Sequence, residues 1–245
     1  MCGVVGIVAK QSVNQEIYNA LTVLQHRGQD SSGIMTDDNG VLCQRKRNGL
    51  VADVFTNKHM LQLRGNIGIG HVRYPTAGSL SEVEAQPFYV NAPFGICLAH
   101  NGNLVNAEQL RNHLELIDRR HLNTESDTEA LLNLFAHELQ KIYIEDLTPK
   151  EIFQAVRGVF EKSSGGYAVI SMILNEGLVA FRDPNAIRPL VIGTRESNQG
   201  TEYMIASESV ALDVLGYTIL RDVLPGEAIY IDNDGNFYSH QCVQV

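Results

Sequence analysis

The sequence predicts an α+β fold in which two packed sheets are covered by helical layers. Short β-branched runs, bounded by Gly, Asn or Pro, dominate both ends of the 245-residue chain. Four helical patterns, grouped in pairs, interrupt these runs, which is unlike the regular alternation of a parallel sheet. Because no Gly/Ser/Pro-rich linker and no internal repeat divides the chain, residues 1–245 are expected to form one domain.

The expected strands begin close to the N-terminus. The apolar run after Met1 resembles a signal-peptide core, but no basic segment precedes it and no small-residue cleavage site follows, so Val4–Ala9 is interpreted as a buried strand. The other strands are expected at Gly33–Thr36, Val41–Arg45, Ile67–His71, Gly95–Ala99, Tyr167–Leu174, Leu178–Arg182, Leu190–Gly193, Tyr203–Ser207 and Ala228–Ile231.

The first two helical patterns are recognised by apolar spacing. One covers Asn14–His26, where Gly28 is placed to end it, and its apolar face is formed by Ile17, Leu21 and Leu24. The next starts after Asn106, with apolar residues at helical spacing at Leu110, Leu114 and Ile117.

The third and fourth patterns are recognised by their N-terminal signals. Ser126 can cap a helix while Glu129 reaches back to the cap, which is the capping-box arrangement. Thr148 and Glu151 repeat this device, and Pro149 occupies the first helical position.

Composition is typical of a globular protein, with 44% hydrophobic and 19% charged residues and no apolar run long enough to span a membrane. We therefore expect a cytoplasmic protein. The net charge of -9 argues against nucleic-acid binding, which depends on clustered Lys and Arg. The basic cluster at residues 45–47 is interpreted as the solvated end of a hairpin strand.

Neither a metal site nor a disulfide framework is expected. The eight histidines are scattered, and the cysteines lack any Cys-x-x-Cys pair. Cys43 and Cys97 lie in strand-like stretches and are interpreted as small buried hydrophobic residues. The remaining two are Cys2 and Cys242, and Cys242 is interpreted as an ordinary thiol.

Cys2 is the candidate nucleophile. If Met1 is removed, Cys2 carries a free α-amino group, whose ordinary pKa of about 7.7–8.0 allows it to take the thiol proton directly or through one water. Position alone does not establish this role, because a small buried residue after the initiator is common. Other residues are needed to support it.

Four polar clusters end predicted strands or helices, at residues 25–30, 70–76, 100–104 and 126–129. Each contains a residue with an ordinary structural explanation. Asn101-Gly102 is typical of a type I′ hairpin turn. Asp127 and Arg27 complement helix dipoles, and Arg73 is explained by a structural ion pair about as well as by a substrate.

Together with Cys2-Gly3, the four clusters resemble the class II, N-terminal-nucleophile glutamine amidotransferases over the whole chain. Sugar-amidating members usually have Tyr at the positions of His26 and Gln29 and Trp at that of Tyr74, and asparagine synthetases usually have Pro at Gln29. Residues 180–190, AFRDPNAIRPL, resemble the phosphoribosyl-transferring branch, which opens purine biosynthesis. Ala186 departs from the usual Gly, which matters only if the backbone there needs a positive φ.

The resemblance implies a four-layer αββα sandwich of the N-terminal nucleophile hydrolase type, and a glutaminase reaction. Cys2 would attack the carboxamide of glutamine and form a thioester, releasing ammonia, while its α-amino group acts as base and then as acid. The Asn101 side-chain amide and the Gly102 backbone N–H would stabilise the oxyanion.

The resemblance also implies how glutamine is held. Arg73 would bind the α-carboxylate and Asp127 the α-ammonium group, leaving the carboxamide directed toward Cys2. Arg27 and Thr76 would be further pocket residues, with Arg27 ordering the N-terminal segment. No cofactor or metal is expected in this domain.

The acceptor half of the reaction is not found in these residues. In the related enzymes a C-terminal phosphoribosyltransferase domain passes the ammonia to phosphoribosyl pyrophosphate, and magnesium and homo-oligomer formation are expected to depend on that domain. No longer propeptide is expected before Cys2, and an iron-sulfur cluster is left open. Two alternatives remain: a catalytically silent, glutamine-binding regulatory fragment, and the glutaminase domain of a sugar-amidating relative, against which residues 182–190 argue.

Overall fold

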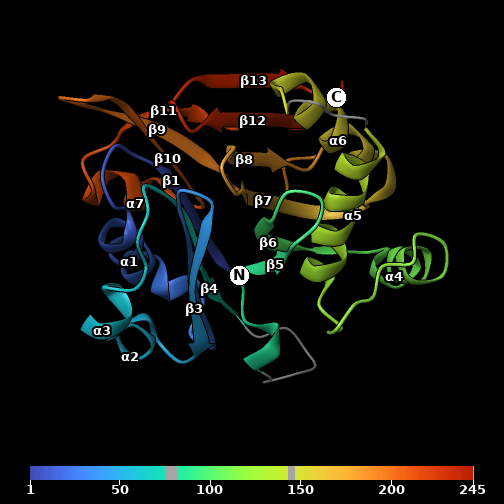
Figure 1. Ribbon diagram of the computed structural model, residues 1–245, viewed down its shortest axis with the longest axis horizontal. Coiled ribbons are helices and arrows are strands. Elements are labelled where there is room, and N and C mark those ends of the chain that lie inside the picture. The colour runs from blue at the N-terminus through green and yellow to red at the C-terminus, as the bar shows by residue number, and fades with distance from the viewer. Residues whose placement is uncertain (75–81, 143–146, 245) are drawn as a thin grey trace.

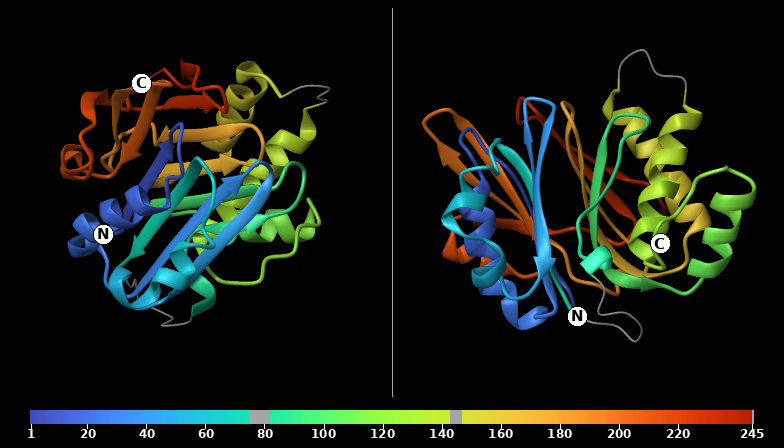
Figure 2. Two further views of the ribbon diagram at one scale, coloured as in Figure 1. Left: turned by 60° about the vertical axis from the view of Figure 1, so that its left-hand side comes forward. Right: turned by 60° about the horizontal axis from the view of Figure 1, so that its bottom comes forward.

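A computed structural model of the chain describes residues 1–74, 82–142 and 147–244. Two antiparallel sheets pack face to face, and helices cover the outer side of each, as Figures 1 and 2 show. The predicted αββα sandwich is therefore confirmed.

The first sheet contains the N-terminal strand near its centre. Its strand order is β11-β9-β10-β1-β4-β2-β3. The strands are β1 (Gly3–Val8), β2 (Ser31–Asp38), β3 (Val41–Asn48), β4 (Ile67–Arg73), β9 (Val191–Ser197), β10 (Gly200–Ala206) and β11 (Thr218–Asp222). The helices on its outer side are α1 (Asn14–Val23), continued by the 3-10 turn η1 (Leu24–Arg27), α2 (Val51–Val54), α3 (Asn57–Met60) and α7 (Ser209–Val214).

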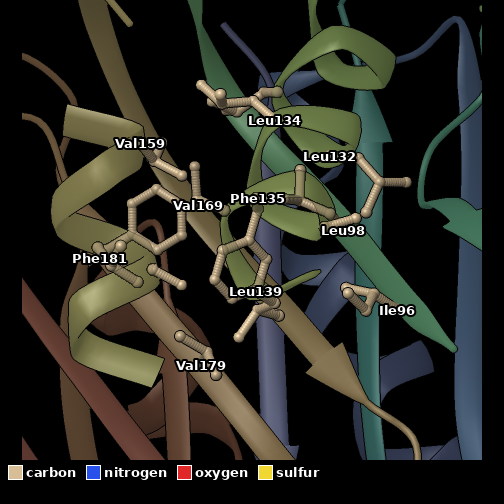
Figure 3. Packing of buried hydrophobic residues seen from close by; sticks show 14 of the residues in the cluster. Ile96, Leu98, Leu132, Leu134, Phe135, Leu139, Val159, Val169, Val179 and Phe181 are labelled. Atoms are coloured by element: carbon tan, nitrogen blue, oxygen red, sulfur yellow. The ribbon is translucent and has the colours of Figure 1, made fainter. Parts of the chain in front are cut away.

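The second sheet has the order β13-β12-β8-β7-β6-β5. Its strands are β5 (Phe88–Val90), β6 (Ile96–Leu104), β7 (Gly165–Ile173), β8 (Gly177–Arg182), β12 (Glu227–Asp232) and β13 (Phe237–Gln241), with the short turn η2 (Glu82–Glu84) before β5. The helices α4 (Ala107–Leu116), α5 (Asp127–Lys141) and α6 (Pro149–Lys162) cover its outer side. Figure 3 shows the apolar layer beneath them, where Phe135 of α5 packs near Phe181 of β8.

Side-chain alternation along the central strands produces three apolar layers. In β1, Val4 and Val8 point into the layer between the sheets, whereas Val5 and Ile7 point toward the helices. A strand buried on both faces has no polar alternation, which is why the run is continuously apolar. The even-numbered residues of β1 therefore face the second sheet.

The interpretation of Asn101-Gly102 as a tight hairpin turn is wrong. β6 continues through both residues to Leu104, with Asn101 opposite Ala168 and Gly102 opposite Tyr167 of β7. Pairing with a strand far along the chain outweighs the local turn preference. The candidate oxyanion residues thus lie on a paired strand and not at a loop tip.

The two predicted capping boxes are also wrong in part. Ser126 caps α5 as expected, since its hydroxyl accepts from the Thr128 N–H at 3.3 Å. The Glu129 carboxylate accepts instead from the backbone of residues 123–124. At α6 the Thr148 hydroxyl donates to the carboxylate of Glu151 rather than accepting from the backbone. The strands β5, β11 and β13 and the helices α2, α3 and α7 were not predicted.

Candidate active site

Cys2 lies at the open end of β1, between the two sheets. Because Gly3 pairs with Val72 in the antiparallel ladder, continuing the register by one residue places Cys2 opposite Arg73. The Tyr74 backbone N–H lies 3.5 Å from the Cys2 Sγ and donates to it. Figure 2 shows this N-terminal edge between the two halves of the sandwich.

The surroundings of the Cys2 thiol oppose its ionisation overall. Burial raises its pKa, and the charge of Asp127 adds to this, whereas the Tyr74 N–H, the N-terminal ammonium and Arg73 lower it. The thiol is therefore the stable form, and a nearby base is needed to generate the nucleophile. In a chain without Met1 the α-amino group of Cys2 is such a base.

Arg73 ends β4 and projects into the same layer as Cys2. Its guanidinium donates to the Asp30 carboxylate at 2.8 Å and pairs with Glu84 of η2. Gly28 lies against its backbone, because a Cβ there would come within 2.4 Å of the Arg73 carbonyl carbon. Of the two explanations left open by the sequence, the ion pair is present in this structure, and the role toward substrate stays a prediction.

Asn101 also faces the space between the sheets, since Cys97 and Ala99 on the same face of β6 belong to that layer. It is 2% exposed, and within the described part of the chain its Nδ2 has no hydrogen-bond partner. A buried donor without a partner costs roughly 1–3 kcal/mol, so an Nδ2 in this position points to a ligand that accepts from it. At Gly102 a Cβ would lie 2.2 Å from the Gly166 carbonyl oxygen, so only Gly fits.

Asp127 begins α5 and is tied to β6 on both sides of the Asn101-Gly102 pair. Its carboxylate accepts from the Leu104 N–H at 3.0 Å and lies 3.7 Å from His100 Nε2. His100 Nδ1 lies 2.7 Å from the Thr128 hydroxyl. These contacts fix the separation between the candidate oxyanion donors and the candidate ammonium ligand. Sequence reasoning assigned no role to His100 or Thr128, because their pairing is visible only after β6 and α5 pack together.

His71 of β4 is a further buried group that the sequence did not single out. Both ring nitrogens lack a partner among the described residues, and burial lowers the pKa of His71 to about 3. The side chain is therefore neutral at physiological pH, and it does not add a positive charge beside Arg73.

Arg27 packs against the backbone of the N-terminal segment. Its Nε donates to the Cys2 carbonyl oxygen at 2.8 Å, and its Nη1 pairs with Glu208. These are contacts of a residue that orders the N-terminal segment, and a role in the glutamine pocket stays a prediction. Thr76 lies outside the described residues.

Over residues 1–74, 82–142 and 147–244 no group of three or more His, Cys, Asp or Glu side chains is arranged to hold a metal ion. Over the same ranges no helix has the length and apolar character needed to cross a bilayer.

Two antiparallel sheets packed face to face, with helices outside both and a cysteine directly before the central strand β1, correspond to the N-terminal nucleophile hydrolase fold. Residues 71–214 match the family described as the glutamine amidotransferase domain. The chain belongs to this family.

Relatives and solved structures point to one branch of the family. The chain is 60% identical over 244 residues to the amidophosphoribosyltransferase of Pseudomonas aeruginosa, covering 100% of this chain and 49% of the relative. It is 59% identical to that of Escherichia coli, covering 99% and 48%. The Bacillus subtilis glutamine phosphoribosylpyrophosphate amidotransferase complexed with ADP and GMP aligns with a TM-score of 0.84 at 35% identity, covering 100% of this chain and 50% of that one. This chain thus spans about half the length of these relatives.

Proposed function

We propose that this chain hydrolyses glutamine to glutamate and ammonia through a thioester on Cys2. The α-amino group of Cys2 takes the thiol proton, and the thiolate attacks the carboxamide carbon. The same group returns the proton to the leaving ammonia. Water then attacks the thioester, giving glutamate and the free thiol.

The Asn101 amide and the Gly102 N–H stabilise the oxyanion that forms in both steps. The observation that carries this assignment is the buried Asn101 Nδ2, which faces the Cys2 layer and has no partner among the described residues. An amide donor held by a paired strand is already oriented, so little reorganisation is needed when charge develops on the substrate oxygen.

Substrate recognition is assigned to the charged groups at the opposite ends of the site. Arg73 binds the α-carboxylate of glutamine, for which a planar guanidinium is suited, and Asp127 binds the α-ammonium group. Glu84 already pairs with Arg73, so the substrate carboxylate competes with it. Arg27 supports the Cys2 backbone.

We further propose that the chain is the glutaminase part of an amidophosphoribosyltransferase. The support is the 60% identity to an enzyme of that name whose sequence is about twice as long. In such a protein the ammonia would attack C1 of phosphoribosyl pyrophosphate and form phosphoribosylamine. The phosphoribosyl site, its magnesium and the assembly into oligomers would reside in the other half.

The test is ammonia release from glutamine by Cys2→Ala, with Cys43→Ala as the matched control. Cys43 is half-buried on β3, in the same sheet but away from the site. We expect Cys2→Ala to abolish activity and Cys43→Ala to retain it. Full activity of Cys2→Ala would refute the proposal. Thermal stabilisation by glutamine without ammonia release from the wild type would instead favour a silent glutamine-binding domain.

A further inference from the structure

We propose that Glu208 is a positioning residue for the nucleophile and acts through Arg27. The inference rests on the proposed function only in taking Cys2 as the nucleophile. Glu208 lies between β10 and α7, far from Cys2 along the chain, and no motif in the sequence marks it.

The first observation is a buried guanidinium with one carboxylate partner. The Arg27 side chain is 5% exposed, and among its contacts in the described part of the chain Glu208 supplies the carboxylate. Removing a guanidinium from water is costly unless a counter-charge accompanies it. Glu208 therefore determines whether Arg27 can remain buried against the N-terminal segment.

The second observation is where the other end of Arg27 points. Its Nε donates to the Cys2 carbonyl oxygen at 2.8 Å. The ladder between β1 and β4 begins at Gly3, so Cys2 lies beyond the paired part of the strand. Chain ends fray unless they are held, and this hydrogen bond fixes the Cys2 backbone from which the thiol projects.

The third observation is that Glu208 is itself fixed to β1. The neighbouring Ser207 exchanges two hydrogen bonds with Val4: its N–H donates to the Val4 carbonyl and its hydroxyl accepts from the Val4 N–H, both at 3.0 Å. The contacts thus close a ring through Cys2, Arg27, Glu208, Ser207 and Val4. A closed ring of this kind resists displacement of Cys2 more than a single hydrogen bond would.

His26 does not hold the Cys2 backbone as Arg27 does. Its Nε2 lies 3.1 Å from the Glu208 carboxylate, but the ring is mostly exposed and makes no described contact with Cys2. The ring is also held from the other side, since its Nδ1 lies 3.0 Å from the Val23 carbonyl oxygen, so it lies beside the Glu208 carboxylate without reaching Cys2.

The experiment compares Glu208→Ala and Glu208→Gln with Glu16→Ala. Glu16 is the control, because it is similarly exposed and pairs with a partly buried Arg195 at the same sheet, away from Cys2; Arg195 keeps a second carboxylate partner in Glu202. Two readouts are used: glutaminase kinetics, and the second-order rate of Cys2 alkylation by iodoacetamide, measured by mass spectrometry of the Cys2 peptide.

We expect Glu208→Ala to lower kcat by about 10- to 100-fold, since a displacement near 1 Å can cost about 10²-fold in rate. KM should change less than about threefold, because Arg73 and Asp127 are untouched, and the Cys2 alkylation rate should also change. Glu208→Gln keeps an acceptor oxygen without the charge, so its kcat should lie between those of the wild type and Glu208→Ala. Glu16→Ala should lower Tm and leave kcat unchanged.

The proposal is overturned if Glu208→Ala lowers Tm as Glu16→Ala does while kcat and the alkylation rate stay within twofold of the wild type. If Glu208→Ala does not fold, Glu208→Gln is judged by the same criterion. Failure of the proposed function would show separately, as glutaminase activity in Cys2→Ala. The alkylation rate reports the Cys2 position even in that case.

Discussion

Replacing Asn101 with Ala should remove most of the glutaminase rate without weakening the fold. The Nδ2 of Asn101 is a buried donor without a partner in the described part of the chain, so the folded state loses no hydrogen bond with it. An unsatisfied buried donor costs roughly 1–3 kcal/mol, and its removal offsets the small cavity left by the amide. In the transition state the same donor is expected to bind the oxyanion, which is worth about 2.7–4 kcal/mol.

The expected result is therefore a kcat reduced by about 100- to 1,000-fold with Tm unchanged or slightly higher. Asn66→Ala is the matched control. Asn66 directly precedes β4, at the end of the strand opposite Arg73, and its Nδ2 donates to the Ala9 carbonyl at 3.0 Å. Loss of that hydrogen bond should cost about 0.5–1.5 kcal/mol, which lowers Tm by roughly 2–4 °C per kcal/mol for a chain of this size, without changing kcat.

The measurements are ammonia release under saturating glutamine and thermal unfolding followed by circular dichroism. An Asn101→Ala variant that keeps its rate within about threefold would show that the amide does not meet the oxyanion. A fall of Tm as large as that of Asn66→Ala would show that the donor has a structural partner, and the physical basis of the assignment would be lost.

Three further predictions concern the scaffold. Ala186 has φ +49°, so Ala186→Gly should relieve a left-handed strain of about 1 kcal/mol and raise Tm by roughly 2–4 °C in thermal melts. Gly28→Ala places a Cβ against the Arg73 backbone and should destabilise the chain by about 1–3 kcal/mol and raise KM for glutamine, checked by urea unfolding and kinetics. His71 has a pKa of about 3 when folded, so the unfolded chain protonates first as pH falls and stability is lost below about pH 6.5. That one group removes about 2 kcal/mol between pH 7 and pH 5, and His71→Asn should show a correspondingly smaller loss in urea melts at the two pH values.

The layers of the fold were predictable because each depends on short-range patterns. The Val4–Val8 segment is continuously apolar, short and β-branched, which favours a strand buried on both faces, and helices that carry one apolar stripe then cover the sheets. Strand β11 was missed because it is an edge strand with most of its side chains exposed. Its position is determined by pairing with β9, and its own sequence carries no alternation.

The site was predictable only in part, and the reason differs from residue to residue. Asn101-Gly102 has a strong local preference for a turn, which the long-range pairing with β7 overrides. Glu129 has the spacing of a capping box, but its carboxylate finds closer donors in the preceding loop. Glu208 has no local signal at all, because its role arises from a contact with Arg27 across the fold.

Under the proposed mechanism, the contacts around Cys2 would let the site assemble before its base, the α-amino group of Cys2, is released. They hold the carbonyl oxygen, through Arg27, and the thiol, through the Tyr74 N–H. Met1 is largely exposed, and its described contact with Arg27 is the 4.0 Å approach of its sulfur to Nη2. Cleavage of the Met1–Cys2 bond therefore converts an amide into an amine without removing a contact that positions Cys2. It also brings the terminal ammonium closer to the thiol, and a closer positive charge lowers the thiol pKa further.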